Sequence, residues 1–227
     1  NMARMIPESI ESVPGIPPSE KEVFQALKKL PKEYTVFHSV AFGGARGDSE
    51  CDFLLVHHIK GYIALEVKGG SITIKNGKEW FSTSEIQGKN EINPTEQAKN
   101  ARNFFHSHYT RKTQKPFPAT YCFAVCLPDC VWNEELSLEL EAENVLDSEK
   151  LLNPFEWAEN LFKTTGFNPG RKGFSEQEHE AFLNLLRPQE ITLPLSEAKR
   201  MRAQEEGLKE MHRLQNYISF FTWSKCI

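Results

Sequence analysis

The chain has 227 residues, of which 39% are hydrophobic, and this is enough to bury one substantial core but not two full domains. No apolar run is long enough to span a membrane, and the N-terminus lacks the pattern of a signal peptide, so we expect a cytoplasmic protein. The formal net charge of -4 excludes a protein that coats nucleic acid with a uniformly basic surface. The absence of a G-x-x-x-x-G-K-[ST] motif excludes ATP hydrolysis through a P-loop.

The first half of the chain alternates between helix and strand signals. After a Pro-rich leader, Ser19 followed by Glu22 fits a capping box and predicts a helix from about residue 20 to 30. Strand-like segments follow, and the last two meet across Asn76-Gly77, which is a strong hairpin signal. These segments cover residues 34–40, 51–56, 62–68, 71–75 and 79–82.

The second half continues the alternation. Asn93 as N-cap, Pro94 at the first position and Glu96 predict a helix that reaches about His108. We then expect a strand at 119–127 and helices near 155–163 and 175–186. This order of elements predicts an α/β fold with three layers.

Three of the five cysteines lie close together in the expected strand at 119–127 or just after it. Cys122, Cys126 and Cys130 lack C-x-x-C spacing and a visible fourth ligand, so a metal site is disfavoured. We expect buried free thiols.

One carboxylate lies within an otherwise apolar segment, where hydrophobic burial does not account for it. Asp52 lies within the apolar run 51–56, and in YIALEVK the period of two points Glu66 and Lys68 to the same face. The short link between the two strands predicts an antiparallel hairpin. If its turn is centred on Ile59, Asp52 lies opposite Glu66, with Cβ atoms roughly 4.5 to 5.5 Å apart.

Opposed carboxylates need a compensating charge, and a divalent cation is the natural one. Oxygen ligands favour Mg²⁺ or Mn²⁺ over Zn²⁺, and Lys68 can add a positive charge beside a phosphate. These are the parts that phosphodiester hydrolysis requires. The alternative interpretation is a solvent-exposed strand face on which Glu66 and Lys68 form an ordinary ion pair. The adjacent His57 and His58 face opposite ways, and a role at the hairpin end is favoured over metal binding.

A segment between residues 99 and 115 is rich in cations and contains no acid, whereas residues 134 to 159 are dominated by acids. Such segregation allows a local phosphate-binding surface on a chain that is acidic as a whole. The alternative is a pair of ordinary solvated faces. The candidate nucleic-acid-binding residues are Lys99, Arg102, Arg111, Lys112 and Lys115.

The string ECDFLLVHHIKGYIALEVKGGSI, preceded by SEKEVFQAL and followed by NPTEQA, resembles the nuclease-related domain, NERD. NERD is a branch of the PD-(D/E)xK restriction-endonuclease-like fold, and the resemblance spans roughly residues 17 to 130. It implies an α/β/α sandwich with a central mixed sheet, and a Mg²⁺- or Mn²⁺-dependent nuclease with DNA as the favoured substrate.

The resemblance also implies which residues form the site. Asp52, Glu66 and Lys68 match the catalytic core, with Glu20 and Gln97 as supporting residues. The implied metal site consists of Asp52, Glu66 and Val67. Ala101 stands where some exonucleases of the wider fold carry a Tyr, which favours endonucleolytic cleavage. The alternative is a catalytically weak nucleic-acid-binding or helicase-adaptor module of the same fold.

We expect three regions along the chain: a leader at 1–16, the nuclease-like domain at 17–170 and a helical C-terminal segment at 171–227. The tail from Ser196 to about Tyr217 is helical by composition and rich in both charges, and it is either a solvated helix or a helix for a partner. The start MARMIP and the segment after 174 resemble NERD proteins fused to a superfamily I helicase. A helicase or a second copy of the chain is therefore the expected partner besides nucleic acid.

Overall fold

A computed structural model describes residues 2–44, 47–84, 88–133, 139–167, 173–186, 206–207 and 209–211. The chain divides into a compact unit from Asn1 to Arg187 and a second unit from Pro188 to Ile227. In the second unit the described residues are helical. Most of the tail helix expected at 196–217 lies outside the described residues. None of the described helices is long and apolar enough to cross a membrane.

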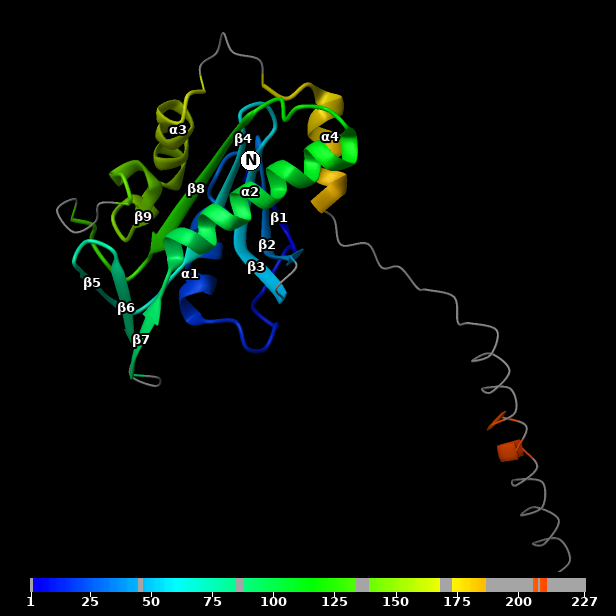
Figure 1. The fold of residues 1–227 in the computed structure, drawn as a ribbon, viewed down its shortest axis with the longest axis horizontal. Helices are drawn as coiled ribbons and strands as arrows, with labels where there is room; N and C mark the ends of the chain where they lie inside the picture. Colours follow the sequence, from blue (N-terminus) through cyan, green and yellow to red (C-terminus); the bar gives the residue numbers. More distant parts are fainter. Residues whose placement is uncertain are drawn as a thin grey trace, which may run out of the picture. The chain divides into compact units, whose positions relative to one another are not determined.

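A six-stranded mixed sheet forms the centre of the compact unit (Figure 1). Strands β2, β3 and β4 are antiparallel neighbours, β1 lies parallel to β2, and β4, β8 and β9 run parallel to one another. The strands in sheet order are β1 (Arg4–Ile6), β2 (Tyr34–Gly44), β3 (Gly47–His57), β4 (Gly61–Val67), β8 (Thr120–Leu127) and β9 (Val145–Asp147).

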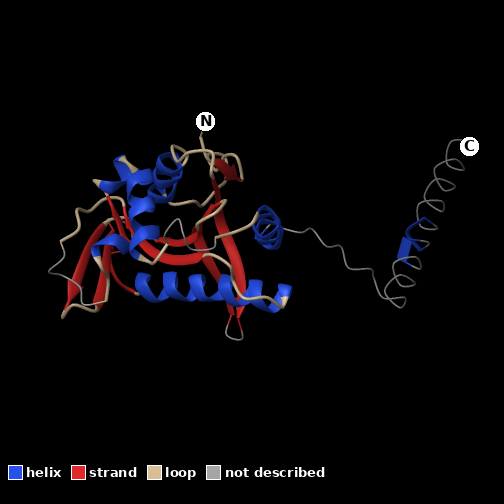
Figure 2. Cartoon of the chain, turned by 90° about the horizontal axis from the view of Figure 1, so that it is seen from above, coloured by secondary structure: helices blue, strands red, loops and turns tan. Residues whose placement is uncertain are grey.

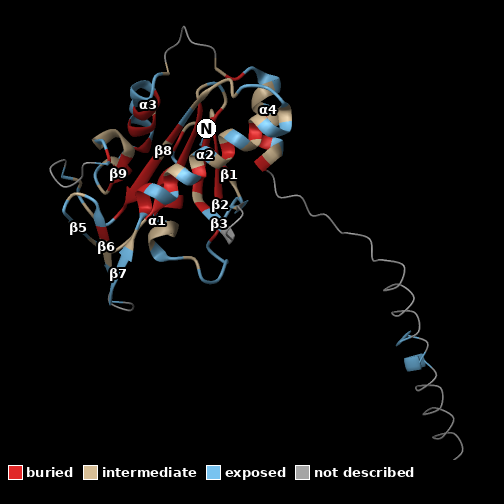
Figure 3. Ribbon diagram, viewed as in Figure 1, coloured by how far each residue is buried: buried red, intermediate tan, exposed pale blue. Residues whose placement is uncertain are grey.

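Helices cover both faces of this sheet, as Figure 2 shows. On one face α1 (Pro18–Leu27) and α3 (Pro154–Thr164) pack against the odd-numbered residues of β3 and β4 from Phe53 onward. On the other face α2 (Pro94–Thr113) and α4 (Glu176–Leu186) pack against the even-numbered residues from Leu54 onward. The buried residues lie mainly on the central strands and on the helices that cover them (Figure 3). The α/β/α sandwich predicted from the sequence is confirmed. Two short 3-10 helices, η2 (Ala142–Asn144) and η3 (Lys150–Leu152), flank β9.

The first helix begins earlier than the sequence predicted. Its N-cap is Pro17, which has no side-chain capping bond, and Pro18 takes the first helical position. Proline suits that position because its fixed φ is helical and its missing N–H is not needed there. The prediction that Ser19 caps the helix was therefore wrong, because Ser19 lies inside α1.

The second helix begins as predicted and runs further. The Asn93 side chain accepts a hydrogen bond from the Glu96 N–H at 3.2 Å, and its amide donates to the Glu96 carboxylate at 2.8 Å. The helix continues past His108 to Thr113 and ends at Gln114, whose φ of 57° is left-handed.

A second, three-stranded sheet consists of β5 (Ser71–Lys75), β6 (Glu79–Ser84) and β7 (Gly88–Ile92). Asn76 and Gly77 connect the first two strands with φ values of 53° and 70°, which confirms the predicted hairpin. One face of this small sheet is apolar, and its Trp80 is buried with Val125 and Leu127 of β8. The small sheet is thereby held against the central one.

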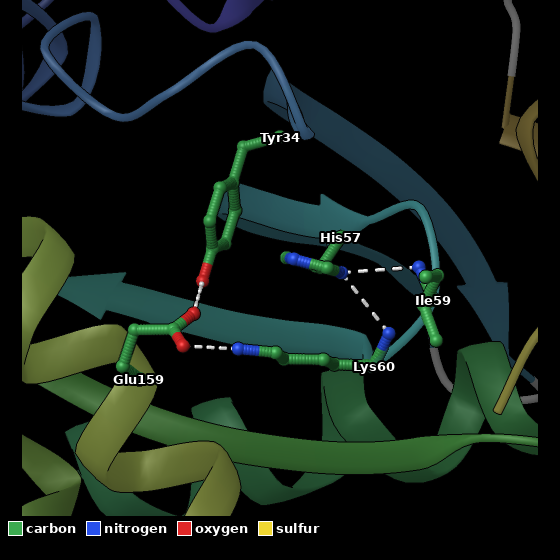
Figure 4. A network of polar contacts seen from close by, with 5 residues as sticks. All are labelled: Tyr34, His57, Ile59, Lys60 and Glu159. Carbon is green, nitrogen blue, oxygen red and sulfur yellow. Dashed lines mark hydrogen bonds and ion pairs between the residues drawn. The ribbon is translucent and has the colours of Figure 1, made fainter. Parts of the chain in front are cut away.

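The closed end of the β3–β4 hairpin is fixed by a polar network (Figure 4). His57 Nδ1 accepts hydrogen bonds from the N–H groups of Ile59 at 3.0 Å and Lys60 at 3.1 Å. Burial lowers the pKa of His57 to about 3, so the imidazole is neutral and can accept both bonds. Glu159 of α3 binds the Lys60 ammonium and accepts a hydrogen bond from Tyr34 Oη at 3.0 Å. The predicted hairpin-end role of His57 is confirmed.

Candidate active site

The open end of the β3–β4 hairpin carries the predicted catalytic residues. The strands follow the predicted register, with Phe53 paired with Leu65 and Leu54 with Ala64. The ladder ends at Phe53 and Leu65, so Asp52 and Glu66 are the first residues past the last pair. Regular alternation of faces also stops there, because Cys51 and Leu54 both pack on the α2 side of the sheet.

The strand pairing is interrupted beside Asp52 on its other side too. In the β2–β3 ladder His38 pairs with Phe53 and Val40 with Cys51, and the intervening Ser39 has a φ of 59°. A left-handed residue inside a strand is uncommon for a side chain with a Cβ, and such residues cluster at functional sites. Asp52 thus lies where neither neighbouring strand offers regular backbone pairing.

The Asp52 carboxylate replaces part of the missing ladder. Its Oδ2 accepts a hydrogen bond from the Val67 N–H at 2.7 Å. This bond fixes the orientation of the carboxylate, because a charged acceptor and a backbone donor form a strong pair. It also joins β3 to β4 beyond the end of their regular pairing.

Glu66 and Lys68 interact along the same strand face, as the period of two predicted. Lys68 Nζ lies 2.8 Å from Glu66 Oε1, and the side chains are 22% and 5% exposed, respectively. The Lys68 N–H donates to the carbonyl of Cys126 on β8, which holds the backbone after β4 in the sheet. The Lys68 ammonium therefore reaches solvent while Glu66 stays buried.

The two carboxylates are electrostatically unfavourable in the protein alone. Burial, followed by the nearby Glu66, raises the pKa of Asp52 well above its usual range. Burial also raises the pKa of Glu66, although Lys68 opposes this increase. Glu20 raises the pKa of both groups. A positive charge between the carboxylates would reverse these shifts, because it favours the ionised forms.

Glu20 reaches the site from the first turn of α1. Its Oε2 lies 2.8 Å from Nε2 of His38, and the side chains of His38 and Glu20 are 5% and 17% exposed. His38 faces α1, where its ring contacts Phe24 and Phe53. The sequence did not single out His38, because nothing local indicates that a strand histidine meets a helix acid 18 residues away.

Part of the site opens into a cleft of about 510 Å³, whereas the buried Glu66 is not among the residues that line it. The central layer and α1 contribute Glu20, Asp52 and Lys68, and the small sheet supplies one wall. That wall consists of Ser82, Asn90 and Ile92, which the sequence did not indicate.

A tight turn after β4 forms the floor of the cleft. A Cβ on Gly69 would lie 2.6 Å from the Cβ of Ser19, so the chains approach more closely there than a side chain permits. Gly70 has a φ of 82°, and its N–H donates to Asp129 Oδ2 at 2.7 Å. Gly69 and Gly70 thus form a turn with a close backbone approach, and Asp129 is a further structural residue of the cleft.

The remaining predicted site residues are distributed differently. Gln97 is exposed on the first turn of α2 and is not among the residues that line the cleft. Val67 donates its N–H to Asp52. In the described part of the chain no three His, Cys, Asp or Glu side chains converge as a metal site. A cation in the cleft would accordingly use two carboxylates, with backbone oxygen or water completing its shell.

The five predicted nucleic-acid-binding cations do not share one face. Lys99 and Arg102 lie over the Phe123 ring of β8, at 5.2 and 5.0 Å from its centroid. Arg111 is nine residues after Arg102, which is about 180° around a helix. Arg111 and Lys112 occupy the last turn of α2, where cations also stabilise the helix dipole, and Lys115 follows the helix end.

The cysteines are free thiols where the structure describes them. Cys51, Cys122 and Cys126 are buried and Cys130 is half-buried. Burial raises the pKa of each of them. Cys51, Cys122 and Cys126 are therefore unreactive core residues. The predicted burial is confirmed for Cys122 and Cys126, whereas Cys130 is only partly buried at the edge of the core.

Comparison with known families gives a match whose range contains Glu20 and the predicted centre at Asp52, Glu66 and Lys68. Residues 18–126 match the nuclease-related domain, NERD. Searches of curated proteins and of solved structures found no match. The matched range includes Glu20, Asp52, Glu66 and Lys68, and it ends at Cys126 on β8. Residues 18–126 of this chain are therefore similar to the nuclease-related domain family.

Proposed function

We propose that the protein is a Mg²⁺-dependent nuclease that cleaves nucleic acid endonucleolytically, with DNA as its substrate. One observation carries the proposal: the β3–β4 hairpin brings Asp52, Glu66 and Lys68 together at the end of one ladder, next to a cleft. An ordinary surface ion pair between Glu66 and Lys68 would not bury Glu66 to 4% exposure or place a second, half-buried carboxyl near it.

The donor set fits a hard divalent cation. Asp52 Oδ2 accepts a hydrogen bond from the Val67 N–H, and Glu66 Oε1 forms the ion pair with Lys68. The other carboxylate oxygens, Asp52 Oδ1 and Glu66 Oε2, are the candidate metal ligands. Carboxylate oxygens favour Mg²⁺ and Mn²⁺. When bound, such an ion supplies Lewis-acid stabilisation of phosphoryl charge and activates water at neutral pH. The raised pKa values of both acids support this assignment, since limited access to water disfavours both ionised forms in the protein alone.

The chain's own residues supply the other requirements of hydrolysis. In the reaction a water oxygen attacks phosphorus, the bond to one ester oxygen breaks, and that oxygen leaves with the electron pair and takes a proton. Negative charge grows on the phosphoryl oxygens as this happens. Lys68 can donate to one of them from its partly exposed position, and Glu20, held by His38, completes the acidic side of the cleft.

The cations of α2 support a polyanionic substrate. Lys99 and Arg102 have no carboxylate within ion-pair distance in the described part of the chain, where the ion pairs are His38–Glu20, Lys60–Glu159 and Lys68–Glu66. They can therefore bind phosphates without breaking an internal pair. We extend the assignment to Arg111, Lys112 and Lys115 as outer contacts.

Single-turnover cleavage of plasmid DNA tests the proposal. Wild type should cleave with Mg²⁺ or Mn²⁺ and lose activity with EDTA. Lys68→Ala should cleave at least about 100-fold more slowly, as loss of one charge-stabilising donor commonly causes, with affinity within a few fold. Lys68→Arg should not restore full activity, because a planar fork cannot replace a compact ammonium.

Lys78→Ala is the matched control, because Lys78 is an exposed lysine in the β5–β6 turn. It should cleave like wild type. Full cleavage by Lys68→Ala would contradict the proposed centre. DNA binding without metal-dependent cleavage by wild type would favour the alternative, a binding module with this fold.

A further inference from the structure

Two aromatic side chains of β8 reach the surface on the α2 side of the sheet. Cys122 and Ala124 face the core beneath α1 and α3, so Tyr121 and Phe123 face the other way. Tyr121 is 36% exposed and Phe123 is half-buried. Two aromatic side chains that stay partly accessible on a central strand form a local apolar contact surface.

One stripe of α2 lies over these rings. Lys99 and Arg102 lie over Phe123, and one turn later the His106 ring lies 4.3 Å from the Tyr121 ring. Spacings of three and four residues place the three side chains on the same side of the helix. The surface formed by Lys99, Arg102, His106, Tyr121 and Phe123 is called the stacking surface below.

The stacking surface is fixed in place and carries positive charge. The Tyr62 hydroxyl donates to the carbonyl of Arg102 at 2.5 Å, which anchors α2 to β4. Lys99 and Arg102 form none of the ion pairs among the described residues. Burial and the nearby Arg102 lower the pKa of His106, so its ring stacks as a neutral imidazole. Flat rings and unpaired cations are thus combined on one surface.

The register of the sheet relates this surface to the candidate active site. β8 pairs in parallel with β4, with Phe123 beside Ala64 and Val125 beside Glu66. Two residues of a strand span about 6.6 Å. The stacking surface therefore lies along the strand next to the one that carries Glu66, within a few nucleotides' reach of it.

We propose that the stacking surface binds unpaired bases of a single-stranded nucleic acid, so that the substrate is single-stranded or carries a single-stranded segment. Bases in a duplex stack on each other, whereas unpaired bases present their faces to aromatic rings and to guanidinium groups. Arg102 on Phe123 and Tyr121 beside His106 provide two such platforms, and Lys99 provides a phosphate contact. This inference rests on the proposed function in taking nucleic acid as the substrate.

The test removes the rings and keeps every charge. Tyr121→Leu combined with Phe123→Leu is compared with wild type in EDTA, by fluorescence anisotropy of a labelled oligothymidylate of about 15 nucleotides and of a duplex of equal length. We expect single-strand affinity to fall at least about tenfold with the salt dependence unchanged, and duplex affinity to stay within about twofold. Lys99→Gln with Arg102→Gln should instead lower the salt slope for the single strand by about 1.4.

Phe155→Leu is the control, because Phe155 is an aromatic residue of α3 that is 44% exposed. It should bind both probes like wild type. Tyr121→Trp keeps a stacking ring and should retain single-strand affinity, which provides a readout even if the leucine variant does not fold. Wild-type affinity for the single strand in a folded leucine variant would overturn the inference. Equal losses on single strand and duplex, or preference for an acidic peptide, would overturn it as well.

The inference and the proposed function fail separately. Loss of single-strand binding in the leucine variant, together with full cleavage by Lys68→Ala, would support the stacking surface and contradict the catalytic centre. The reverse pattern would keep the nuclease and remove the stacking surface.

Discussion

Replacing Asp52 with asparagine should stabilise the metal-free protein. The pKa of the Asp52 carboxyl is raised to about 8, chiefly by burial, so ionising it near neutral pH opposes folding. A group whose folded pKa lies above its unfolded value lowers stability as pH rises between the two values. A difference of one in pKa between the folded and unfolded states corresponds to about 1.4 kcal/mol. Part of the free-energy cost of ionisation is shared with the neighbouring Glu66. We therefore expect Asp52→Asn to raise the free energy of unfolding by an amount on the order of 2 kcal/mol at pH 8.

The asparagine preserves the local structure. Its side-chain oxygen can still accept the hydrogen bond from Val67, and its volume matches that of aspartate. Urea unfolding in EDTA between pH 5 and 8.5 measures the effect. The gain should be small near pH 5 and should grow toward pH 8. With Mg²⁺ the order should reverse, because binding stabilises only the wild type.

Asp147→Asn provides the contrast. Asp147 is buried at 4% exposure on β9 and accepts hydrogen bonds from the N–H groups of Trp132 and Lys150, outside the cleft. Its replacement should lower stability, because charge-assisted bonds are weakened without any relief of repulsion. If Asp52→Asn loses stability in EDTA at pH 8 as Asp147→Asn does, the two carboxylates do not repel each other and the reasoning is refuted.

Three further substitutions probe the supports of the site. Tyr34→Phe removes the hydrogen bond to Glu159 and should lower the free energy of unfolding by about 1 kcal/mol in urea titration without changing cleavage. Gly69→Ala places a methyl group against Ser19, and it should lower both thermal stability and cleavage, whereas an unchanged melting temperature would show that α1 can shift freely. His38→Ala should reduce cleavage without loss of DNA affinity, and His38→Gln, which keeps a donor, should recover part of the rate.

The local parts of the structure could be predicted from the sequence. The β3–β4 register followed from a short turn and the period of two, and both are properties of neighbouring residues. The start of α2 followed from Asn93, Pro94 and Glu96, whose capping bonds form within one turn. The predicted start of α1 was too late because Ser19 was interpreted as the N-cap, whereas Pro17 is the N-cap and Pro18 occupies the first helical position.

The remaining parts depend on contacts between distant segments. The strands β1, β7 and β9 are three to five residues long and obtain their pairing from neighbours rather than from their own propensity. For the same reason the wall formed by Ser82 and Asn90 had no signal in the sequence. The meeting of His38 with Glu20 requires α1 to be docked on the sheet, which only the folded core determines.

The three acids of the candidate active site are each held by a different kind of donor. Asp52 accepts from a backbone N–H, Glu66 from the Lys68 ammonium, and Glu20 lies against the His38 imidazole. The N–H of Val67 is available to Asp52 because the β3–β4 ladder has already ended at the Phe53–Leu65 pair. The interruption of the sheet therefore both exposes the carboxylate and orients it. A cation that enters would meet oxygens already fixed by the fold, so little ordering of side chains would oppose its binding.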